Sequence, residues 1–542
     1  MDGNLASLDI AALDAAMPAT IPHMLRERVD QTPEREAFVF FDHGITVSYS
    51  ELDDQVRRVA GGLLELGVRK GTHVALMMPN VIEFPVTWFA IAWIGAVTVQ
   101  LNPKFTGREL DYALNDADVD FLVIDAEALS SLEAMEMRSE RLPDSNIIVC
   151  NDDSGVGAAH VAWETLLACA ALSREPRAGV TSDDVIAIIY SSGTTGFPKG
   201  CMLDHRYWLQ IATSALICQD GHTPRNSLIY EPMFYIQGNA IMIASLLTNA
   251  TIYCPKRPSI SKFFDWVQRY QIDYCAFPVP AVHVMEDYPP EVCASLKWVH
   301  AWYFHSDGLQ RLEERYDVIA RDSYAMTENG VCLYVPVDRP DLAVRGSVGV
   351  PAPWREIRIV GDDGNDVADG EIGEVWTAGP GHLHGYYHKT AANRDSFRGK
   401  WFRTGDLMRR EADGGYYLVG RMKDMIKRSG ENISAAEVEG CLSSLPGVLM
   451  AAVISVPDAI RGEEVKAYVQ LGPGLGRDDL TPSQILAHCA ENLAAFKLPR
   501  YLAYVDAFPM TAGNDKVSKP KLTEAVEDLT IGAFDRIDKV WR

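Results

Sequence analysis

Short runs of apolar residues, many of them β-branched, recur along roughly the first 345 positions and alternate with amphipathic stretches such as 49–67. Strands that are apolar on both faces and separated by helices are typical of parallel sheets built from βαβ units. We therefore predict strands of such sheets at HVALMMP (73–79), AVTVQL (96–101), DFLVID (120–125), NIIVC (146–150), VIAIIY (185–190) and ATIYC (250–254).

One uncharged stretch, FPVTWFAIAWIGAVTVQLNP (84–103), approaches the length of a membrane-spanning helix. However, Pro85 opens the stretch, Gly95 interrupts it, and the residues VTVQL that follow have the composition of a strand. We predict a buried helix that leads into a buried parallel strand, and no membrane span.

The pattern changes after about residue 345. Residues 355–379 contain two alternating segments around an Asp- and Gly-rich turn, which indicates antiparallel strands. Farther along we expect a helix from about Ala435, strands at AAVISVP (451–457) and VKAYVQL (465–471), and a helix near 484–493. The stretch 424–542 is long enough for a separate small α+β domain, so we predict domains at 1–422 and 423–542.

The chain of 542 residues has 50 lysines and arginines against 74 aspartates and glutamates, a formal net charge of −24. Such a field repels phosphate backbones and anionic headgroups, which disfavours nucleic acids and membrane surfaces as partners. The ten cysteines include no C-x-x-C pair, and the N-terminus is acidic where a signal peptide would be basic. We therefore expect a cytoplasmic protein with reduced thiols. The sequence does not determine the oligomeric state, and a homodimer is compatible with it.

The segment DVIAIIYSSGTTGFPKG (184–200) carries the clearest chemical signal. An apolar strand ends at Tyr190 and leads into a loop with three glycines, four hydroxyls and one lysine. Glycines allow close backbone approach to an anion, and hydroxyls and a lysine add donors and charge, a set suited to polyphosphate. The lysine precedes a glycine, so this is not the Walker motif. The predicted phosphate-binding residues are Ser191, Ser192, Gly193, Thr194, Thr195 and Lys199.

The loop YSSGTTGFPKG resembles the phosphate loop of the adenylate-forming superfamily, which includes acyl-CoA synthetases, peptide-synthetase adenylation domains and luciferases. Within that superfamily, MIKRSGEN and DAIRGEEVKAYVQL look most like crotonobetaine/carnitine-CoA ligases and their acyl-CoA synthetase relatives. The resemblance implies an α/β fold with a large N-terminal region of two doubly wound α/β subdomains plus a distorted β-barrel, and a small mobile α+β C-terminal domain. Further signatures follow in order as SYAMTENG (323–330), GEIGEVWTAGPGHLHGYYHKT (370–390), WFRTGDL (401–407), GRMKDMIKRSGENISAAEVE (420–439) and FKLPRYLAYVDAFPMTAGNDKVSK (496–519).

The resemblance also implies which residues act on the phosphates. Glu328 would hold Mg²⁺, Thr327 would hydrogen-bond the α-phosphate of ATP, and Lys516 would bridge the α-phosphate and the substrate carboxylate. The terminal signature departs from the usual pattern, because it has one extra residue and Asp515 replaces the glycine before the lysine. Lys519 is therefore a rival for the role of Lys516.

Other signature residues would bind the rest of the nucleotide and the thiol. Tyr324 would stack on adenine, and Asp406, supported by Arg421, would accept hydrogen bonds from the ribose hydroxyls. Lys423 would be the hinge between domains, and Gly430 would leave room for the pantetheine arm. The loop beside adenine would comprise Ser306, Asp307 and Gly308.

The sequence identifies the residues of the acyl pocket less clearly. Amino-acid-activating relatives carry an aspartate where this chain has Tyr235, which cannot pair with an α-ammonium group, so an ordinary α-amino acid is disfavoured. Aromatic core packing is at least as good an explanation for the other candidates. These pocket candidates are Gln237, Trp302, Tyr303 and His305.

Together these features predict an acyl-CoA synthetase that uses Mg²⁺, ATP and CoA. A carboxylic acid would attack the α-phosphate to give acyl-AMP and pyrophosphate, and the CoA thiol would then displace AMP. The nearest alternative is a ligase that loads the phosphopantetheine of a carrier protein. A non-catalytic ATP or AMP sensor is a third interpretation, and the joint presence of Glu328, Asp406 and Lys516 argues against it.

Overall fold

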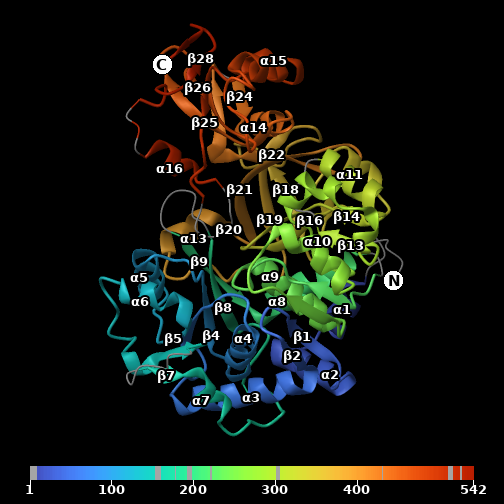
Figure 1. Cartoon of the computed structure of the whole chain (residues 1–542), viewed down its shortest axis with the longest axis vertical. Helices are drawn as coiled ribbons and strands as arrows, with labels where there is room; N and C mark the ends of the chain where they lie inside the picture. The colour runs from blue at the N-terminus through green and yellow to red at the C-terminus, as the bar shows by residue number, and fades with distance from the viewer. Residues whose placement is uncertain are drawn as a thin grey trace. The chain divides into compact units, whose positions relative to one another are not determined.

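The chain forms two compact units, one made of Met1–Ile357 and Thr377–Phe402 and the other of Arg358–Trp376 and Arg403–Arg542. The second unit contains most of the orange and red elements in Figure 1. It takes in two stretches that precede Lys423, and the boundary between 422 and 423 stays a prediction. The computed structural model describes residues 9–152, 160–177, 179–191, 198–219, 222–300, 306–429, 431–510, 517–524, 526 and 528–542, without the side chains of Val279, His283, Ser306, Asp307 and Asn432.

The first unit contains a seven-stranded sheet formed by residues between 73 and 204. Its neighbouring strands are parallel except for the antiparallel pair β8 and β9. The sheet confirms the predicted parallel strands of this region. Its strand order is β7 (Val161–Ala162), β6 (Ile147–Cys150), β5 (Phe121–Asp125), β3 (His73–Met77), β4 (Val97–Leu101), β8 (Val185–Ser191) and β9 (Lys199–Asp204).

A second seven-stranded sheet in the same unit has one antiparallel pair, β1 with β2, and is otherwise parallel. The two sheets together confirm two doubly wound α/β subdomains. The order of this sheet is β14 (Ile319–Arg321), β13 (Trp298–His300), β12 (Tyr274–Ala276), β10 (Asn226–Leu228), β11 (Thr251–Cys254), β1 (Glu36–Phe40) and β2 (Ile45–Ser48).

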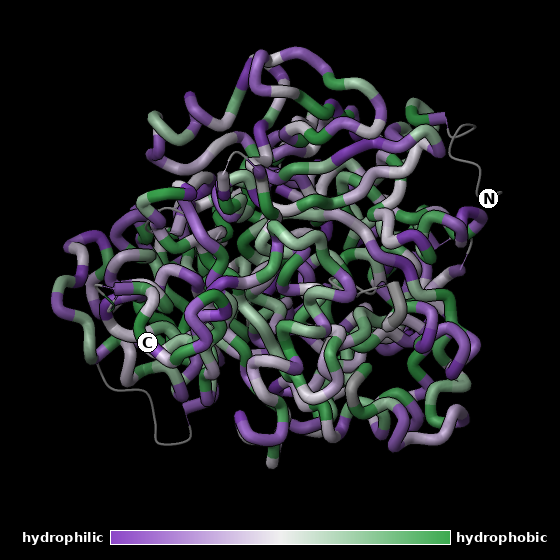
Figure 2. The backbone as a smooth tube through the Cα atoms, turned by 90° about the horizontal axis from the view of Figure 1, so that it is seen from above, coloured by the Kyte–Doolittle hydropathy of each residue, from purple (hydrophilic) through white to green (hydrophobic). Residues whose placement is uncertain are grey.

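Five helices of more than ten residues share one hydrophobic core with these two sheets. The first turn of α3 is set by a capping box in which Ser48 and Glu51 satisfy each other's backbone N–H groups. Figure 2 shows hydrophobic segments running through the interior and hydrophilic ones mostly in outer loops. The five helices are α2 (Ile21–Gln31), α3 (Tyr49–Glu65), α4 (Glu83–Ile94), α8 (His205–Ile217) and α9 (Ile236–Leu247).

The uncharged stretch 84–103 forms a helix and a strand, as predicted. Every residue of α4 is buried, and Gly95 ends the helix with φ of 75° before β4 begins. Glycine adopts this left-handed conformation without strain. Within the part of the chain that the structure describes, no helix has both the length and the apolarity to cross a bilayer.

The remaining elements of the first unit are a small sheet and further helices. A three-stranded antiparallel sheet comprises β15 (Ser323–Met326), β16 (Gly330–Tyr334) and β17 (Val350–Pro351). The further helices are α1 (Ile10–Ala16), α5 (Gly107–Asp116), α6 (Leu129–Glu133), α7 (Trp163–Leu167), α10 (Ile260–Arg269), α11 (Ser306–Tyr316), α12 (Pro340–Val344) and α13 (Thr390–Ser396).

The chain passes between the units within strands of a five-stranded sheet, which supplies the half-barrel part of the fold. The two alternating segments of 355–379 are β18 and β19, which are neighbours in this sheet. The path runs β18 (Glu356–Val360), β19 (Ile372–Ala378), β21 (Trp401–Arg410) and β20 (Phe397–Arg398), and β22 (Tyr416–Arg421) pairs with β21.

The rest of the second unit is a mixed sheet with helices, which confirms the expected α+β texture and its predicted elements. Its path is β24 (Glu431–Ser434), β23 (Met425–Arg428), β26 (Gly462–Leu471), β27 (Tyr501–Tyr504), β28 (Phe534–Asp535) and β29 (Val540–Trp541), and β25 (Val448–Asp458) pairs with β26. The helices are α14 (Ala435–Ser443), α15 (Pro482–Asn492) and α16 (Lys519–Thr523).

Candidate functional site

The predicted phosphate loop lies between two antiparallel strands of the first unit. Ser191 ends β8, Lys199 begins β9, and the two residues pair across the ladder. Gly200 has no room for a side chain, because an added Cβ would lie 2.7 Å from Ile188 Cγ2. The other predicted loop residues, Ser192, Gly193, Thr194 and Thr195, lie outside the described residues.

Helix α5 holds both ends of this loop. The Tyr190 hydroxyl donates to Asp116 Oδ2 at 3.1 Å, and the Tyr112 hydroxyl donates to Pro198 O at 2.8 Å. Lys389 forms an ion pair with the other oxygen of Asp116. The stems of the loop are thus fixed by tyrosines and an ion pair that sequence reasoning did not single out.

Thr327 and Glu328 lie in the turn between β15 and β16. Tyr207 donates from its hydroxyl to Thr327 O at 3.0 Å, and Leu383 N donates to Glu328 O at 2.9 Å. Glu328 is 7% exposed, and its Oε1 accepts a hydrogen bond of 2.9 Å from the Tyr386 hydroxyl. The turn therefore presents a buried carboxylate whose orientation a buried phenol sets.

Tyr386 also contacts the lysine that follows the phosphate loop. Lys199 Nζ lies 4.3 Å from the centre of the Tyr386 ring, within cation–π range. Burial, and then the nearby Glu328 carboxylate, raise the pKa of Tyr386 well above its ordinary value, so the phenol remains a hydrogen-bond donor. Sequence reasoning missed this residue, although the signature that ends in GYYHKT contains it.

Tyr324 lies on β15, the strand that leads into the Glu328 turn, and is 8% exposed. The structure thus places Tyr324, Thr327 and Glu328 on one hairpin. The predicted adenine-side residues belong to another element: Ser306 and Asp307 begin α11, with side chains that are not described, and Gly308 follows in its first turn.

In the second unit, Asp406 and Arg421 face each other across β21 and β22. Arg421 Nε lies 3.0 Å from Asp406 Oδ1, and Asp406 is 4% exposed. Thr404 helps to fix this part of β21, because its hydroxyl accepts from Asp406 N at 3.1 Å and donates to Val375 O at 2.8 Å. The result is a buried carboxylate paired with a guanidinium group.

The hinge candidate Lys423 lies in the short 3-10 helix Met422–Asp424 of the second unit. Burial lowers the pKa of its ammonium group, and Asp424 partly offsets this shift. Lys519, the rival catalytic lysine, lies 2.8 Å from Glu439 and 3.9 Å from Asp424 through its Nζ. The predicted residues Gly430 and Lys516 lie outside the described residues.

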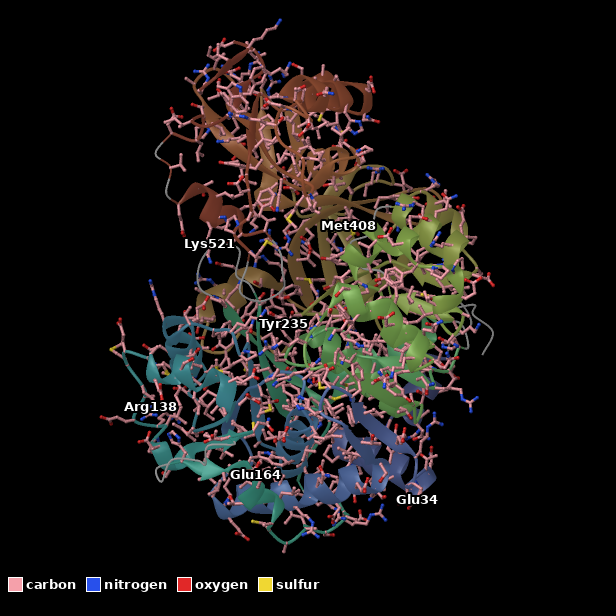
Figure 3. All side chains as sticks on the ribbon, in the orientation of Figure 1. Glu34, Arg138, Glu164, Tyr235, Met408 and Lys521 are labelled. Atoms are coloured by element: carbon pink, nitrogen blue, oxygen red, sulfur yellow. The ribbon has the colours of Figure 1, made fainter. Side chains whose placement is uncertain are left out.

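Two of the predicted acyl-pocket residues are described. Tyr235 directly precedes α9, Gln237 lies in its first turn, and both are half-buried. The Tyr235 hydroxyl accepts from Asn102 Nδ2 at 3.2 Å, and its ring centre lies 4.4 Å from that of Phe234. Figure 3 labels Tyr235 where elements of the two α/β sheets of the first unit meet. Trp302, Tyr303 and His305 lie outside the described residues.

The surroundings of Glu328 fit the ligand chemistry of magnesium. Mg²⁺ prefers oxygen ligands, keeps several waters and is usually held by one or two carboxylates together with substrate phosphates. Among the described residues, no three His, Cys, Asp or Glu side chains gather so that they could hold a metal ion by themselves. Glu328 is one buried carboxylate, and Lys199 lies near Tyr386, the phenol that donates to Glu328. This arrangement fits a Mg²⁺ ion that binds together with its nucleotide.

Two family models match the chain. The model described as AMP-binding enzyme matches residues 25–387, and the model described as AMP-binding enzyme C-terminal domain matches residues 437–514. The putative acyl-CoA synthetase YngI of Bacillus subtilis (strain 168) is 30% identical over 93% of this chain and 97% of its own length.

Two solved structures with the same fold contain bound ligands, one an acyl-adenylate and the other ATP with magnesium. The anthranilate CoA ligase AuaEII in complex with anthranoyl-AMP superposes with a TM-score of 0.84 and 25% identity over 95% of this chain and 98% of its own. The O-succinylbenzoate coenzyme A synthetase of Bacillus subtilis, in complex with ATP and magnesium ion, has a TM-score of 0.78 and 27% identity over 91% and 98% of the two chains.

Proposed function

The chain belongs to the family of AMP-binding enzymes, and from that premise we propose how its residues activate a carboxylic acid with ATP and pass the acyl group to CoA. It is an acid–thiol ligase, an acyl-CoA synthetase of the adenylate-forming superfamily. One observation carries the proposal: Tyr386 donates to the buried Glu328 carboxylate at 2.9 Å while Lys199 lies 4.3 Å from its ring. The oxygen that we propose binds the metal and the lysine that we propose binds phosphate both contact this phenol.

In the first step, an oxygen of the substrate carboxylate attacks the α-phosphorus, the bond to the bridging oxygen breaks, and acyl-AMP and pyrophosphate form. Two anions must meet, so Lys199 and the loop that precedes it would neutralise the phosphates. Thr327 would hydrogen-bond the α-phosphate, and Lys516 would bridge the two reacting groups. Glu328 would hold Mg²⁺, which, when bound, supplies positive charge to the phosphates.

A further set of groups would recognise the nucleoside. Tyr324 would offer its ring to adenine, beside Ser306, Asp307 and Gly308. Asp406 would accept hydrogen bonds from the ribose hydroxyls, because a carboxylate offers several lone pairs. Arg421, 3.0 Å away, would keep that carboxylate oriented.

In the second step, the CoA thiol attacks the acyl carbon and AMP leaves. We propose Lys423 as the hinge that lets the small domain change orientation between the steps. Gly430 would leave space for the pantetheine arm, and Tyr235 and Gln237 would line the acyl site. Turnover with CoA, compared with turnover on a holo-carrier protein, separates this acceptor from the carrier-protein alternative.

We also propose that the enzyme works in a reducing compartment, the cytoplasm. The thiols of all ten cysteines are outside disulfides, and eight of them are buried. Buried thiols without disulfides are typical of proteins from such compartments. Alkylation of the native protein with iodoacetamide should modify at most the two half-buried thiols, Cys169 and Cys441, whether or not a reductant is added.

Pyrophosphate release across a panel of carboxylic acids, with and without CoA, tests the proposed function. We expect release that depends on the acid and on Mg²⁺, with thioester formation only when CoA is present. Proteinogenic α-amino acids should be poor substrates, because Tyr235 cannot form the ion pair that an α-ammonium group needs. Release with amino acids alone, or no release with any acid, would contradict the proposal.

A further inference from the structure

A set of buried amide side chains lies beneath the turn 231–235, the segment that carries Tyr235. Asn80, which follows β3 and is 1% exposed, accepts from Met233 N at 2.8 Å and donates to Glu231 O at 3.2 Å. A turn that leaves its sheet has backbone groups that the ladder cannot satisfy, and buried ones must find partners elsewhere. Asn80, which follows strand β3 of the first sheet, supplies two of these partners to the turn.

Gln100 and Asn239 continue this layer. Asn239, in α9, donates to Met233 O at 2.6 Å. In the alternative orientation of its amide, Gln100 donates to Phe234 O at 3.0 Å and accepts from Trp88 Nε1 at 2.9 Å. Because Gln100 is 4% exposed and Asn239 is 0% exposed, water cannot substitute for these partners.

The turn also packs against α9 without a spacer. A Cβ added at Gly238 would lie 2.5 Å from Pro232 O and 2.9 Å from Met233 Cα, so only glycine permits this approach. The backbone that precedes Tyr235 is therefore held from below by amides and from the side by the helix. The direction of the Tyr235 side chain is then left to its own contacts.

The contact that orients this side chain comes from the carboxyl end of β4. Asn102 follows that strand directly, is 7% exposed, and donates from Nδ2 to the Tyr235 hydroxyl at 3.2 Å. Its Oδ1 accepts from Lys104 N at 2.9 Å, which fixes the amide and makes Nδ2 the end that faces the phenol. Ligands of α/β folds bind at the carboxyl ends of strands, where both residues lie.

We propose that Asn102 is a positioning residue for the acyl site: it fixes the Tyr235 ring against the bound acid and so sets acid affinity without touching the nucleotide. This inference rests on the proposed function, because it takes Tyr235 as a wall of the acyl pocket. It predicts that loss of the Asn102 amide affects the KM for the acid and spares the KM for ATP.

A double-mutant cycle tests the proposal with the full-length enzyme. Octanoate, benzoate, ferulate and 2-succinylbenzoate are screened by pyrophosphate release, and kinetic constants are measured with the acid that gives the highest rate. Asn102→Ala should raise the KM for that acid about 3- to 10-fold, the scale of one neutral hydrogen bond, and leave the KM for ATP within about twofold. In a Tyr235→Phe background, Asn102→Ala should add nothing.

One control variant and one fallback measurement keep the test decisive. Asn146 directly precedes β6 of the same sheet and donates from Nδ2 to Asp120 O at 2.9 Å, so Asn146→Ala also removes an amide donor and should change neither constant. If Asn102→Ala does not fold, Tyr235→Phe alone removes the same bond, leaves the Asn102–Lys104 contact intact and should raise the KM for the acid. An unchanged KM for the acid, or an equal rise from Asn102→Ala in both backgrounds, overturns the inference while wild-type turnover leaves the proposed function standing. If the wild type releases pyrophosphate with none of the acids, the proposed function itself falls, and the inference with it.

Discussion

Tyr386→Phe is the sharpest test of the proposed metal and phosphate site. The substitution removes the hydroxyl that donates to Glu328 Oε1 at 2.9 Å and keeps the ring that lies 4.3 Å from Lys199 Nζ. It therefore separates the hydrogen bond from the cation–π contact. We expect weaker binding of the metal–nucleotide complex, because the carboxylate loses the group that orients it.

The size of the effect follows from burial and charge. Tyr386 is 3% exposed and Glu328 is 7% exposed, so water cannot take the place of the phenol. A hydrogen bond to a charged group contributes about 1.5–3 kcal/mol. Since about 1.4 kcal/mol corresponds to a factor of ten, we expect the KM for MgATP, or the half-saturating Mg²⁺ concentration, to rise about 10- to 100-fold.

Initial rates of pyrophosphate release, titrated with Mg²⁺ at fixed ATP, measure this effect. The matched control is Tyr387→Phe, because the next residue in the chain donates its hydroxyl to a different carboxylate, Asp118, at 3.0 Å. The control should titrate like the wild type. Thermal stabilisation by AMP without metal gives a second readout, which Tyr386→Phe should leave unchanged.

Three results would refute this reasoning. The first is a wild-type Mg²⁺ titration for Tyr386→Phe. The second is an equal shift for Tyr387→Phe, which would point to a general loss of tyrosine hydroxyls near the site. The third is full additivity with Glu328→Gln, a change expected to slow adenylation about 100-fold by itself, because two partners of one bond must be coupled.

Other predictions concern the second unit and pH. Lys516→Ala should abolish acyl-AMP formation yet still convert supplied acyl-AMP and CoA to thioester. Lys519→Ala should adenylate normally and melt about 1–2 °C lower, since it loses its ion pairs with Glu439 and Asp424; the reverse pattern would assign the role to Lys519. Asp406→Asn should raise the KM for ATP about tenfold or more, and wild type and variant should not differ with 2′,3′-dideoxy-ATP. The hydrogen bond to Asp204, 2.7 Å away, raises the pKa of His384 above its ordinary 6.5. The contribution of this pair to the stability of the folded protein is therefore fully present below pH 6.5 and is lost as the pH rises through the pKa of His384 in the folded protein. His384→Gln should thus lower the melting temperature at about pH 6 and leave it nearly unchanged at about pH 9; equal losses at both values would remove the argument.

Patterns between near neighbours were enough to predict much of the fold. The parallel strands follow from apolar runs, and the helix that ends at Gly95 before β4 follows from one glycine and a change of composition. These features depend on periodicity and on allowed φ values, which are properties of short segments. The order of the signatures likewise pointed to Glu328 and Asp406, because each signature is a run of consecutive residues.

The tertiary structure alone decided which distant side chains meet. Tyr386 is 58 residues from Glu328 along the chain, and Asn102 is 133 residues from Tyr235. Nothing in the local pattern around either residue specifies its partner, because the pairing depends on how two sheets and their connecting turns pack together. The same holds for Lys519, whose ion pair with Glu439 joins α16 to α14. Sequence by itself determined the chemical groups available to the site, and packing determined which of them hold one another in place.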